Sequence, residues 1–291
     1  MSRALRIVLG VVILFVGALA LLFLLRGPES TRLLTRLLTR QDATWVEMQA
    51  RGTWRVGMDP SFPPFERLDD AGVPVGYDVD LARAIAAEWN LEVEIIPIGY
   101  DSLIDALRAG RIDSVVSALP YDARATRDVA FSTPYFDAGV RLAVRIDSPI
   151  TSTASLSGGQ VAVEWGSMGD MVGRRIQREG MALELMPYET PMDAVDALLN
   201  DPAVDALLID QVSLREAQGQ GATIVAVGPA LESNPYVIAM PLRAYDLHER
   251  MEGTLAQFAA TGVLAELESR WFGPLPDGLE PEGNKSVGSE P

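Results

Sequence analysis

A carboxylate and an aromatic ring follow the first predicted strand of this chain at a short spacing. The strand runs over 54–57, Asp59 and Phe62 come directly after it, and the prolines Pro63 and Pro64 follow. Proline fixes φ and lacks an amide donor, so this segment can neither extend the strand nor begin a helix. The pattern predicts a rigid segment that holds a carboxylate and a ring at a strand end, where open α/β sheets bind ligands. A carboxylate binds cations, and a ring face packs on aliphatic or cationic groups.

Two later predicted strands also end in polar side chains, and an aromatic residue opens a nearby helix. Ser117 ends the strand 112–117, where its hydroxyl can hydrogen-bond a ligand, and Asp210 directly follows the strand 204–209. Tyr100 stands at the start of a predicted helix. Aspartate is also a favoured turn and cap residue, so a purely structural role for both aspartates stays open.

A third candidate lies at the start of a helix that is predicted to run through Arg178. The tripeptide Gly-Ser-Met at 166–168, centred on Ser167, offers backbone amides to a carboxylate without a charged side chain. The alternative is that Ser167 is an ordinary N-cap residue. Both interpretations stay open.

The composition excludes several classes of chemistry. The formal net charge of −16 and a pI near 4.5 argue against nucleic acid and anionic lipid surfaces as partners. The chain has no cysteine, which excludes disulfides, thiolate metal sites, a cysteine nucleophile and a lipid-modified cysteine. The one histidine, His248, lies in a charged stretch and is expected to be a solvated surface residue. We expect no catalytic residues, no metal and no cofactor.

The N-terminal segment is typical of membrane targeting. Residues 7–25 carry no charge over a length that can span a bilayer, and Arg3 and Arg6 precede them. We expect a cytoplasmic tail at 1–6, an uncleaved transmembrane anchor at 7–25 and a juxtamembrane linker at 26–51. A cleaved signal peptide, with Ala18–Ala20 as the cleavage site, is the alternative.

The remaining elements alternate between strands and helices, which predicts an α/β fold with parallel strands and right-handed crossovers. Helices are expected at 42–50, 80–89 and 102–108, the last with a capping box formed by Ser102 and Asp105. The segments 104–117 and 195–209 share the order helix, turn, acid, apolar strand. This internal echo predicts two lobes of like topology.

Five motifs together resemble the family 3 extracellular solute-binding proteins, which are polar amino-acid receptors of ABC importers. They are DPSFPPFE at 59–66, GYDVDLARAIA at 76–86, GRIDSVVSAL at 110–119, FSTPYF at 131–136 and GVLAELESRWFG at 262–273. The resemblance implies a two-lobed periplasmic-binding-protein-like fold of type II. Lobe 1 would comprise 52–139 and 237–273, lobe 2 would comprise 140–236, and 274–291 would form a disordered tail.

The same resemblance implies roles for single residues. Asp59 and Asp210 match the carboxylates that bind a ligand ammonium, and Phe62 and Tyr100 match the aromatic platform, whereas Phe65 is expected in the core of the lobe. The family's carboxylate-binding arginine falls on position 125, which is alanine here. Either Arg124 replaces it through an altered loop, or the ligand's acid is held otherwise, or the ligand is not a standard amino acid.

The resemblance also implies a function. We expect a monomeric receptor at the cell membrane, with its binding domain on the extracytoplasmic side, that captures a small polar solute, such as an amino acid or a derivative, and delivers it to ABC permease subunits. Two alternatives share the fold: a sensory module that signals through a partner, and an enzyme similar to cyclohexadienyl or arogenate dehydratases.

Overall fold

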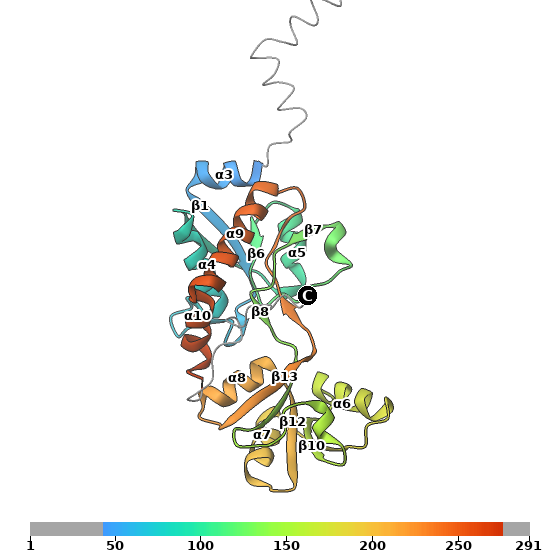
Figure 1. Ribbon diagram of the computed structural model, residues 1–291. Helices are drawn as coiled ribbons and strands as arrows, with labels where there is room; N and C mark the ends of the chain where they lie inside the picture. The colour runs from blue at the N-terminus through green and yellow to red at the C-terminus, as the bar shows by residue number, and fades with distance from the viewer. Residues whose placement is uncertain (1–42, 276–291) are drawn as a thin grey trace, which may run out of the picture. The chain divides into compact units, whose positions relative to one another are not determined.

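A computed structural model describes residues 43–275, and the predicted tail, anchor and cleavage site at 1–25 and residues 276–291 of the predicted C-terminal tail lie outside this range. Within the described range, no helix combines the length and the apolar character that crossing a bilayer requires. The architecture consists of two five-stranded α/β sheets, each with its own helices (Figure 1). We call the part built on the first sheet lobe 1 and the part built on the second sheet lobe 2.

Lobe 1 contains a mixed sheet in which β1 pairs in parallel with two neighbours, and the fourth strand in spatial order runs antiparallel to the strands on either side of it. In spatial order its strands are β5 (Glu92–Pro97), β1 (Thr53–Met58), β6 (Ser114–Val115), β15 (Ala239–Pro241) and β7 (Val129–Phe131). Its helices are α3 (Ala43–Arg51), α4 (Tyr77–Glu88), α5 (Leu103–Arg108), α9 (Tyr245–Thr261) and α10 (Val263–Phe272). The predicted helices are therefore present within a few residues of their expected bounds.

Lobe 2 repeats this order. Its strands are β11 (Glu184–Tyr188), β10 (Gln160–Glu164), β12 (Val204–Asp210), β9 (Val140–Arg145) and β13 (Ile224–Glu232). Again the first three strands are parallel, and the fourth, β9, runs antiparallel to both of its neighbours, β12 and β13. Its helices are α6 (Met168–Arg178), α7 (Pro191–Asn200) and α8 (Gln211–Gly219). The two sheets confirm the expected two-lobed α/β architecture.

The two similar segments, 104–117 and 195–209, each contain an aspartate before or at the start of the strand, and these aspartates make equivalent contacts in the two lobes. Asp113 accepts a hydrogen bond from the backbone N–H of Arg55 in β1 at 2.9 Å, and Asp205 accepts one from Gln160 in β10 at 2.8 Å. Each acid stands at the start of the third parallel strand and fixes its loop to the neighbouring strand. The sequence echo therefore corresponds to an equivalent contact.

Asp113 makes more polar contacts than Asp205, and replacing it measures how much these contacts contribute to stability. Its carboxylate is 4% exposed and also forms ion pairs with Arg51 and Arg55. We expect Asp113→Ala to lower the free energy of unfolding by about 1–3 kcal/mol, because it leaves partly buried donors unpaired. Asp113→Asn, which keeps an acceptor oxygen, should lose less than half of that in urea unfolding. Equal losses in the two variants would contradict the hydrogen-bond explanation.

The chain crosses between the lobes in two segments that pair with each other. The short strands β8 (Phe136–Asp137) and β14 (Pro235–Tyr236) form a two-stranded antiparallel ribbon. The strands β2 (Ser61–Phe62), β3 (Glu66–Leu68) and β4 (Pro74–Val75) form a small separate sheet in lobe 1. This small sheet carries most of the DPSFPPFE motif.

Helix α3 is packed into lobe 1, although the stretch 26–51 is expected to be a linker. Trp45 and Met48 are 5% and 0% exposed and belong to the main hydrophobic cluster. The Trp45 ring lies edge-on to Trp89 at 5.4 Å, and the Arg250 guanidinium lies 4.3 Å from the Trp45 ring centroid. The described end of that stretch is therefore a folded part of the lobe.

Two local predictions are wrong. Ser102 does not cap α5, because it ends a 3-10 turn (Tyr100–Ser102) with helical backbone angles and makes no side-chain cap hydrogen bond. His248 is not simply solvated: its side chain is 38% exposed, and Nε2 lies 3.0 Å from the carbonyl oxygen of Phe131.

An aromatic cluster packs the ribbon against Phe65, against α4 and against α10, the last helix of lobe 1. The Phe65 ring is fully buried, which confirms its expected place in the core. Its ring centroid lies 5.2–5.6 Å from four other rings, which belong to Tyr77, Phe136, Tyr236 and Phe272. Such edge-to-face contacts add to the stabilisation from burial alone.

Candidate functional site

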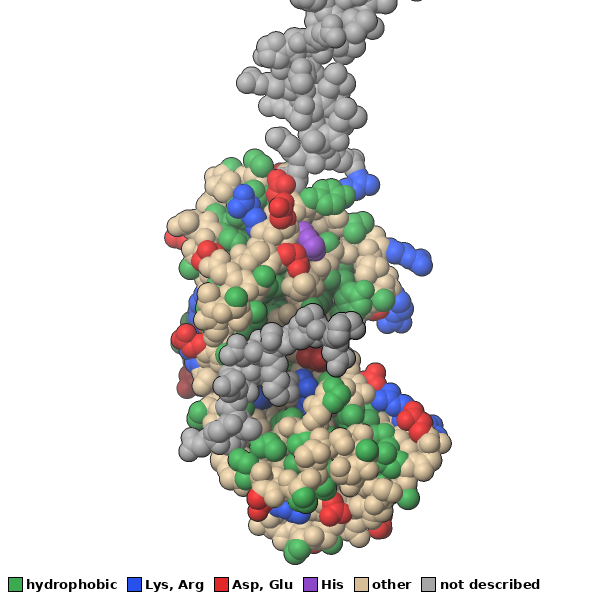
Figure 2. Space-filling view, in the orientation of Figure 1, with side chains coloured by type: hydrophobic (Ala, Val, Ile, Leu, Met, Phe, Trp, Pro, Cys, Tyr) green, Lys and Arg blue, Asp and Glu red, His purple; other side chains and the backbone are tan. Residues whose placement is uncertain are grey.

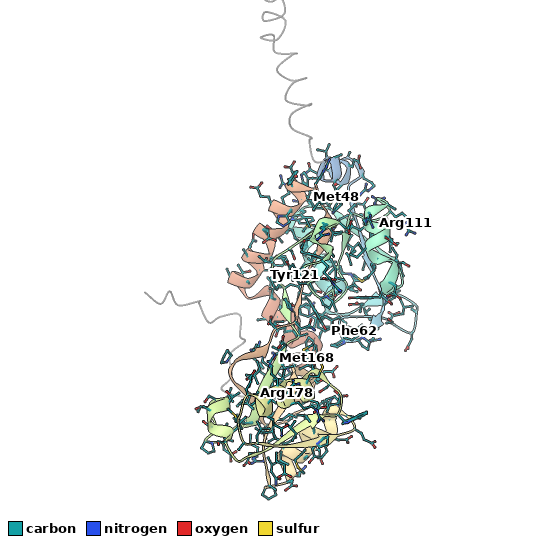
Figure 3. The ribbon with its side chains drawn as sticks, turned by 90° about the vertical axis from the view of Figure 1, so that its right-hand side faces the viewer. Met48, Phe62, Arg111, Tyr121, Met168 and Arg178 are labelled. Atoms are coloured by element: carbon teal, nitrogen blue, oxygen red, sulfur yellow. The ribbon has the colours of Figure 1, made fainter. Side chains whose placement is uncertain are left out.

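Four of the seven predicted site residues line one pocket of lobe 1. The pocket has a volume of about 320 Å³. It is lined by Asp59, Ser61, Phe62, Glu66, Tyr100, Ser117, Ala118, Pro120 and Tyr236. The predicted residues meet because β1, β5 and β6 are parallel, so their carboxyl ends lie at one edge of the sheet. Figure 3 labels Phe62 at one end of lobe 1 and Met48 of α3 at the other.

Hydrogen bonds connect three of these residues to one another. The backbone N–H of Tyr100 donates to Asp59 Oδ2 at 2.8 Å, and the N–H of Asp59 donates to Ser117 Oγ at 3.0 Å. The Ser117 hydroxyl in turn donates to Glu66 Oε1 at 2.7 Å. Asp59 is thus held by the segments that follow β5 and β6.

The two predicted platform rings are accessible to a ligand. Phe62 and Tyr100 are each 45% exposed, which is unusual for large rings in a well-packed lobe. The Phe62 ring stacks on the buried Phe65 ring with centroids 5.8 Å apart and planes 9° apart. One face of the Phe62 ring therefore packs on the core. The rest of the ring is exposed and is available for contact with a ligand.

The pocket residue Glu66 belongs to a buried pair of carboxyl groups. Glu66 and Asp78 are 1% and 0% exposed, and each carboxyl group lies close enough to shift the pKa of the other. Asp78 Oδ2 accepts from Tyr135 at 3.0 Å and from the N–H of Ala118, whose φ of +39° is uncommon outside glycine. Glu66 Oε2 and Asp78 Oδ1 have no donor within the described residues. A proton between the two carboxyl groups supplies the missing donor.

Electrostatics support this shared proton. Burial raises the pKa of Glu66, and the charge of Asp78 raises it further. Burial also raises the pKa of Asp78, while hydrogen bonds from Glu66, Ala118 and Tyr135 act in the opposite direction. Two adjacent buried carboxylates cannot both ionise at low cost, so one stays protonated.

The pair makes stability depend on pH in a predictable direction. The folded pKa of Glu66 is raised above its unfolded value of about 4.3. Its contribution to stability is therefore fully present below that value and is lost as the pH rises toward the folded pKa. We expect Glu66→Gln, which cannot ionise but still donates to Asp78, to reduce the fall in stability between pH 5 and pH 8 by about 1 kcal/mol per pH unit.

Urea unfolding at pH 5, 6.5 and 8 measures this effect. Glu92→Gln, at an exposed position of β5, is the matched control for the loss of one charge. The control should follow the wild type at all three pH values. If Glu66→Gln also runs parallel to the wild type, Glu66 does not carry the proton.

Two further predicted residues, Ser167 and Asp210, line a pocket of about 250 Å³ in lobe 2. The pocket is formed by Glu164, Ser167, Met168, Gly169, Pro191, Leu207, Leu208, Ile209 and Asp210. Ser167 is the N-cap of α6, where its Oγ accepts from the N–H of Asp170 at 3.2 Å. The N-cap alternative for Ser167 therefore describes its hydrogen bonding in this structure.

Asp210 also acts as an N-cap. Its Oδ1 accepts from the N–H of Ser213 at 2.9 Å and its Oδ2 from the Ser213 hydroxyl at 2.7 Å, at the start of α8. Its charge reaches other groups as well. After burial, the charge of Asp210 is the next cause that raises the pKa of Glu164 and of Tyr236, and Tyr236 lines the pocket of lobe 1.

The seventh predicted residue, Arg124, is not brought to either pocket. Its side chain is 92% exposed and pairs with Asp122 through Nε and Nη2 at 3.0 Å. Ala125, at the position of the family arginine, lies in a short 3-10 turn and packs partly against the core. The arginine that the resemblance requires is thus absent from the lining of both pockets.

Several lining residues are not among the predicted site residues, and Glu66, Glu164 and Tyr236 are the titratable ones. Glu66 ends the DPSFPPFE motif directly after the core residue Phe65, and this position could have marked it as an inward-facing acid. Glu164 ends a predicted strand in the same way as Ser117. Tyr236 carries no comparable signal, because it reaches the pocket from the ribbon, far along the chain.

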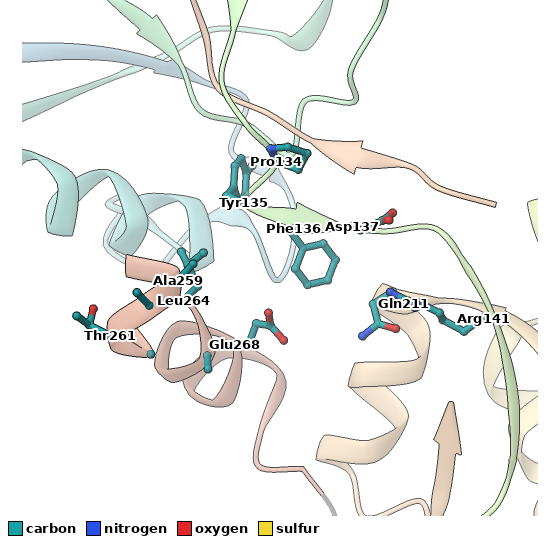
Figure 4. Close-up of a pocket in the computed structure, with 13 residues that line it drawn as sticks. Pro134, Tyr135, Phe136, Asp137, Arg141, Gln211, Ala259, Thr261, Leu264 and Glu268 are labelled. Atoms are coloured by element: carbon teal, nitrogen blue, oxygen red, sulfur yellow. The ribbon is translucent and has the colours of Figure 1, made fainter. Parts of the chain in front are cut away.

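A larger cavity of about 610 Å³ contains none of the predicted residues. It lies where α9 and α10 approach β8, and Arg141, Gln211 and Glu268 contribute polar groups (Figure 4). Over residues 43–275, no group of three or more acidic or histidine side chains could hold a metal ion. On the face of Figure 2, acidic and basic side chains are interspersed and do not form a basic patch.

Comparisons with known proteins agree with this geometry. A profile of bacterial extracellular solute-binding proteins, family 3, matches residues 54–274. The chain is 29% identical over 227 residues to the histidine-binding periplasmic protein of Salmonella typhimurium, covering 75% of this chain and 86% of that protein.

Solved structures show the same architecture. An ancestral cationic amino-acid solute-binding protein matches with a TM-score of 0.60 and 27% identity, covering 79% of this chain and 99% of that one. An ancestral cyclohexadienyl dehydratase matches with a TM-score of 0.66 and 22% identity, covering 78% and 95% of the two chains, a likeness of fold alone.

Proposed function

The chain belongs to the bacterial extracellular solute-binding proteins of family 3, and on that premise we propose that it is a receptor that delivers a small polar solute, such as an amino acid or a derivative, to an ABC importer. The observation that carries this proposal is the pocket of lobe 1. It combines a fixed carboxylate, Asp59, with two exposed rings and a buried hydroxyl. Such a mixture of one charge, ring faces and few polar groups is typical of small-molecule sites.

We further propose that the pockets of lobe 1 and lobe 2 are two halves of one ligand site. Asp59 would bind the cationic group of the solute from lobe 1, and Asp210 would bind it from lobe 2. The charge of Asp210 raises the pKa of Tyr236, which lines the pocket of lobe 1. Because salt screens charges that lie farther apart than about 10 Å, this effect supports a short distance between the two residues. The paired crossing strands β8 and β14 would serve as the hinge on which the lobes close.

A thermal-shift screen of the full-length protein tests the receptor function. A solute at 100 times its dissociation constant should stabilise the protein by about 2.7 kcal/mol. Amino acids, amines, sugars and organic acids should be compared at equal concentration. If no small solute raises the melting temperature, the receptor function is refuted.

Catalysis is not part of the proposal. The curated relative above is a binding protein, and the structural likeness to a dehydratase extends to the fold alone. Incubation with prephenate and arogenate provides the check, and turnover of either compound would replace the receptor by an enzyme. A sensory role would instead show as solute binding without uptake by a permease.

The membrane attachment belongs to the proposal as well. We propose that residues 7–25 anchor the receptor, so that the binding domain stays at the extracytoplasmic surface as a monomer. N-terminal sequencing of the protein extracted from membranes distinguishes an intact anchor from a cleaved signal. A sequence that begins after Ala20 would contradict the anchor.

A further inference from the structure

We infer that the ligand of the two pockets is an organic cation that carries no carboxylate, such as an alkyl amine, an amidinium or a quaternary ammonium compound. This inference rests on the proposed receptor function and narrows the solute that the receptor takes. It follows from the charges, the hydrogen-bond donors and the rings that line the two pockets.

The lining of both pockets is acidic and contains no cation. Their carboxyl groups belong to Asp59, Glu66, Glu164 and Asp210, and none of the lining residues is arginine, lysine or histidine. A ligand carboxylate would enter a field of like charge with no guanidinium to bind it. The nearby Arg124 points its charge to Asp122 and to solvent.

In the pocket of lobe 1, the side-chain donors left for an anion are neutral hydroxyls, those of Ser61, Tyr100 and Tyr236. The backbone N–H groups of Asp59, Tyr100 and Ala118 all donate to side chains within the lobe, as does the hydroxyl of Ser117. Pro120 has no N–H at all. A carboxylate here would lie beside Asp59 and would accept from neutral hydroxyls, without the charge-assisted hydrogen bonds that bind carboxylates strongly.

In lobe 2, the beginning of α6 is suited to an anion, and the chain's own Asp170 already lies there. Its Oδ2 accepts from the N–H of Gly166 at 3.1 Å, and its Oδ1 forms an ion pair with Arg174 at 2.8 Å. Ser167 Oγ accepts from the N–H of Asp170. The helix dipole at this end therefore faces a carboxylate of the protein itself, which competes with one from a ligand.

The exposed rings supply the other half of cation recognition. Phe62 and Tyr100 offer exposed ring area, and Tyr236 lines the same pocket. A cation over a ring face gains about 0.5–2 kcal/mol, more as water is excluded. The charge of Asp210 raises the pKa of Glu164 after burial does, which shows that the acids repel each other. A bound cation relieves that repulsion.

Matched ligand pairs test the inference, because each pair differs by one carboxylate. The pairs are arginine with agmatine, lysine with cadaverine, histidine with histamine, and glycine betaine with tetramethylammonium. Isothermal calorimetry on the full-length protein should give at least one pair in which the compound without the carboxylate binds more than 10-fold tighter. Measurements at 0.15 M and 0.5 M salt separate pocket binding from weak attraction to the acidic surface, which salt screens.

Each outcome decides one claim. If an amino acid or glycine betaine binds tighter than its partner, the ligand carboxylate is recognised, so the inference is wrong while the receptor function stands. Tight binding of a sugar or an organic acid alone leads to the same conclusion. If no solute of any class binds, the receptor function itself fails.

An arginine variant adds an independent test. The ratio of affinities within a pair should be the same in the wild type and in Arg124→Ala, because Arg124 lines neither pocket. If Arg124→Ala weakens the amino acid more than 10-fold but leaves its amine unchanged, Arg124 holds a carboxylate. That result would overturn the inference.

Discussion

Replacement of Asp210 by asparagine is expected to weaken a cationic ligand by about 30- to 1,000-fold, the effect of removing one partner of a buried charge pair. The fold should remain intact. Asp210 caps α8 by accepting from the backbone and the hydroxyl of Ser213. Asparagine keeps an acceptor oxygen and caps helices about as well as aspartate. The variant therefore removes the charge and keeps the cap.

Calorimetry and urea unfolding on the same samples separate the two roles of Asp210. Asp201→Asn is the matched control, because the exposed Asp201 also accepts a backbone N–H, that of Ala203, and lines neither pocket. It should change neither affinity nor stability by more than the error. If Asp210→Asn binds as the wild type does, Asp210 is a structural cap alone.

Phe65→Ala is expected to lower the free energy of unfolding by about 3–5 kcal/mol, the usual cost of deleting a buried aromatic ring. Phe65 touches rings of α4, of the ribbon and of α10, so its removal opens a cavity where these elements meet. At about 2–4 °C per kcal/mol for a chain of this size, the melting temperature should fall by about 10 °C.

The stacked neighbour Phe62 provides the matched comparison. Phe62→Ala removes the same number of atoms, but from a ring that is 45% exposed. It should cost about 1 kcal/mol or less in stability, as for most changes at the surface, while weakening a cationic ligand by about 3- to 30-fold through the lost cation–π contact. Equal losses of stability in the two variants would contradict the division between a core ring and a ligand ring.

Local patterns predicted the strand ends well. Asp59, Phe62, Tyr100 and Ser117 meet in one pocket because parallel strands bring their carboxyl ends to one edge, which the alternation of strands and helices already implies. The capping box at Ser102 failed for a local reason, because the chain enters α5 through a 3-10 turn.

Contacts between distant segments could not be predicted in this way. Glu66 is buried because it pairs with Asp78 and Ser117, which lie on other elements. Tyr236 reaches the pocket only because the returning chain pairs with β8. The position of Arg124 depends on the conformation of its own loop, where Asp122 holds it. Spacing along the chain does not specify any of these contacts.

The distribution of tryptophan gives the protein an intrinsic optical signal for ligand binding. Of the five tryptophans, Trp45 and Trp54 are buried in lobe 1, and Trp89 and Trp271 are half-buried there. Trp165 alone is well exposed, at 72%, directly after the pocket residue Glu164. If the lobes close over a solute, we expect the exposure of this indole to fall more than that of the other four. A blue shift and brightening of the fluorescence emission, absent in Trp165→Phe, would then follow binding in real time without any added label.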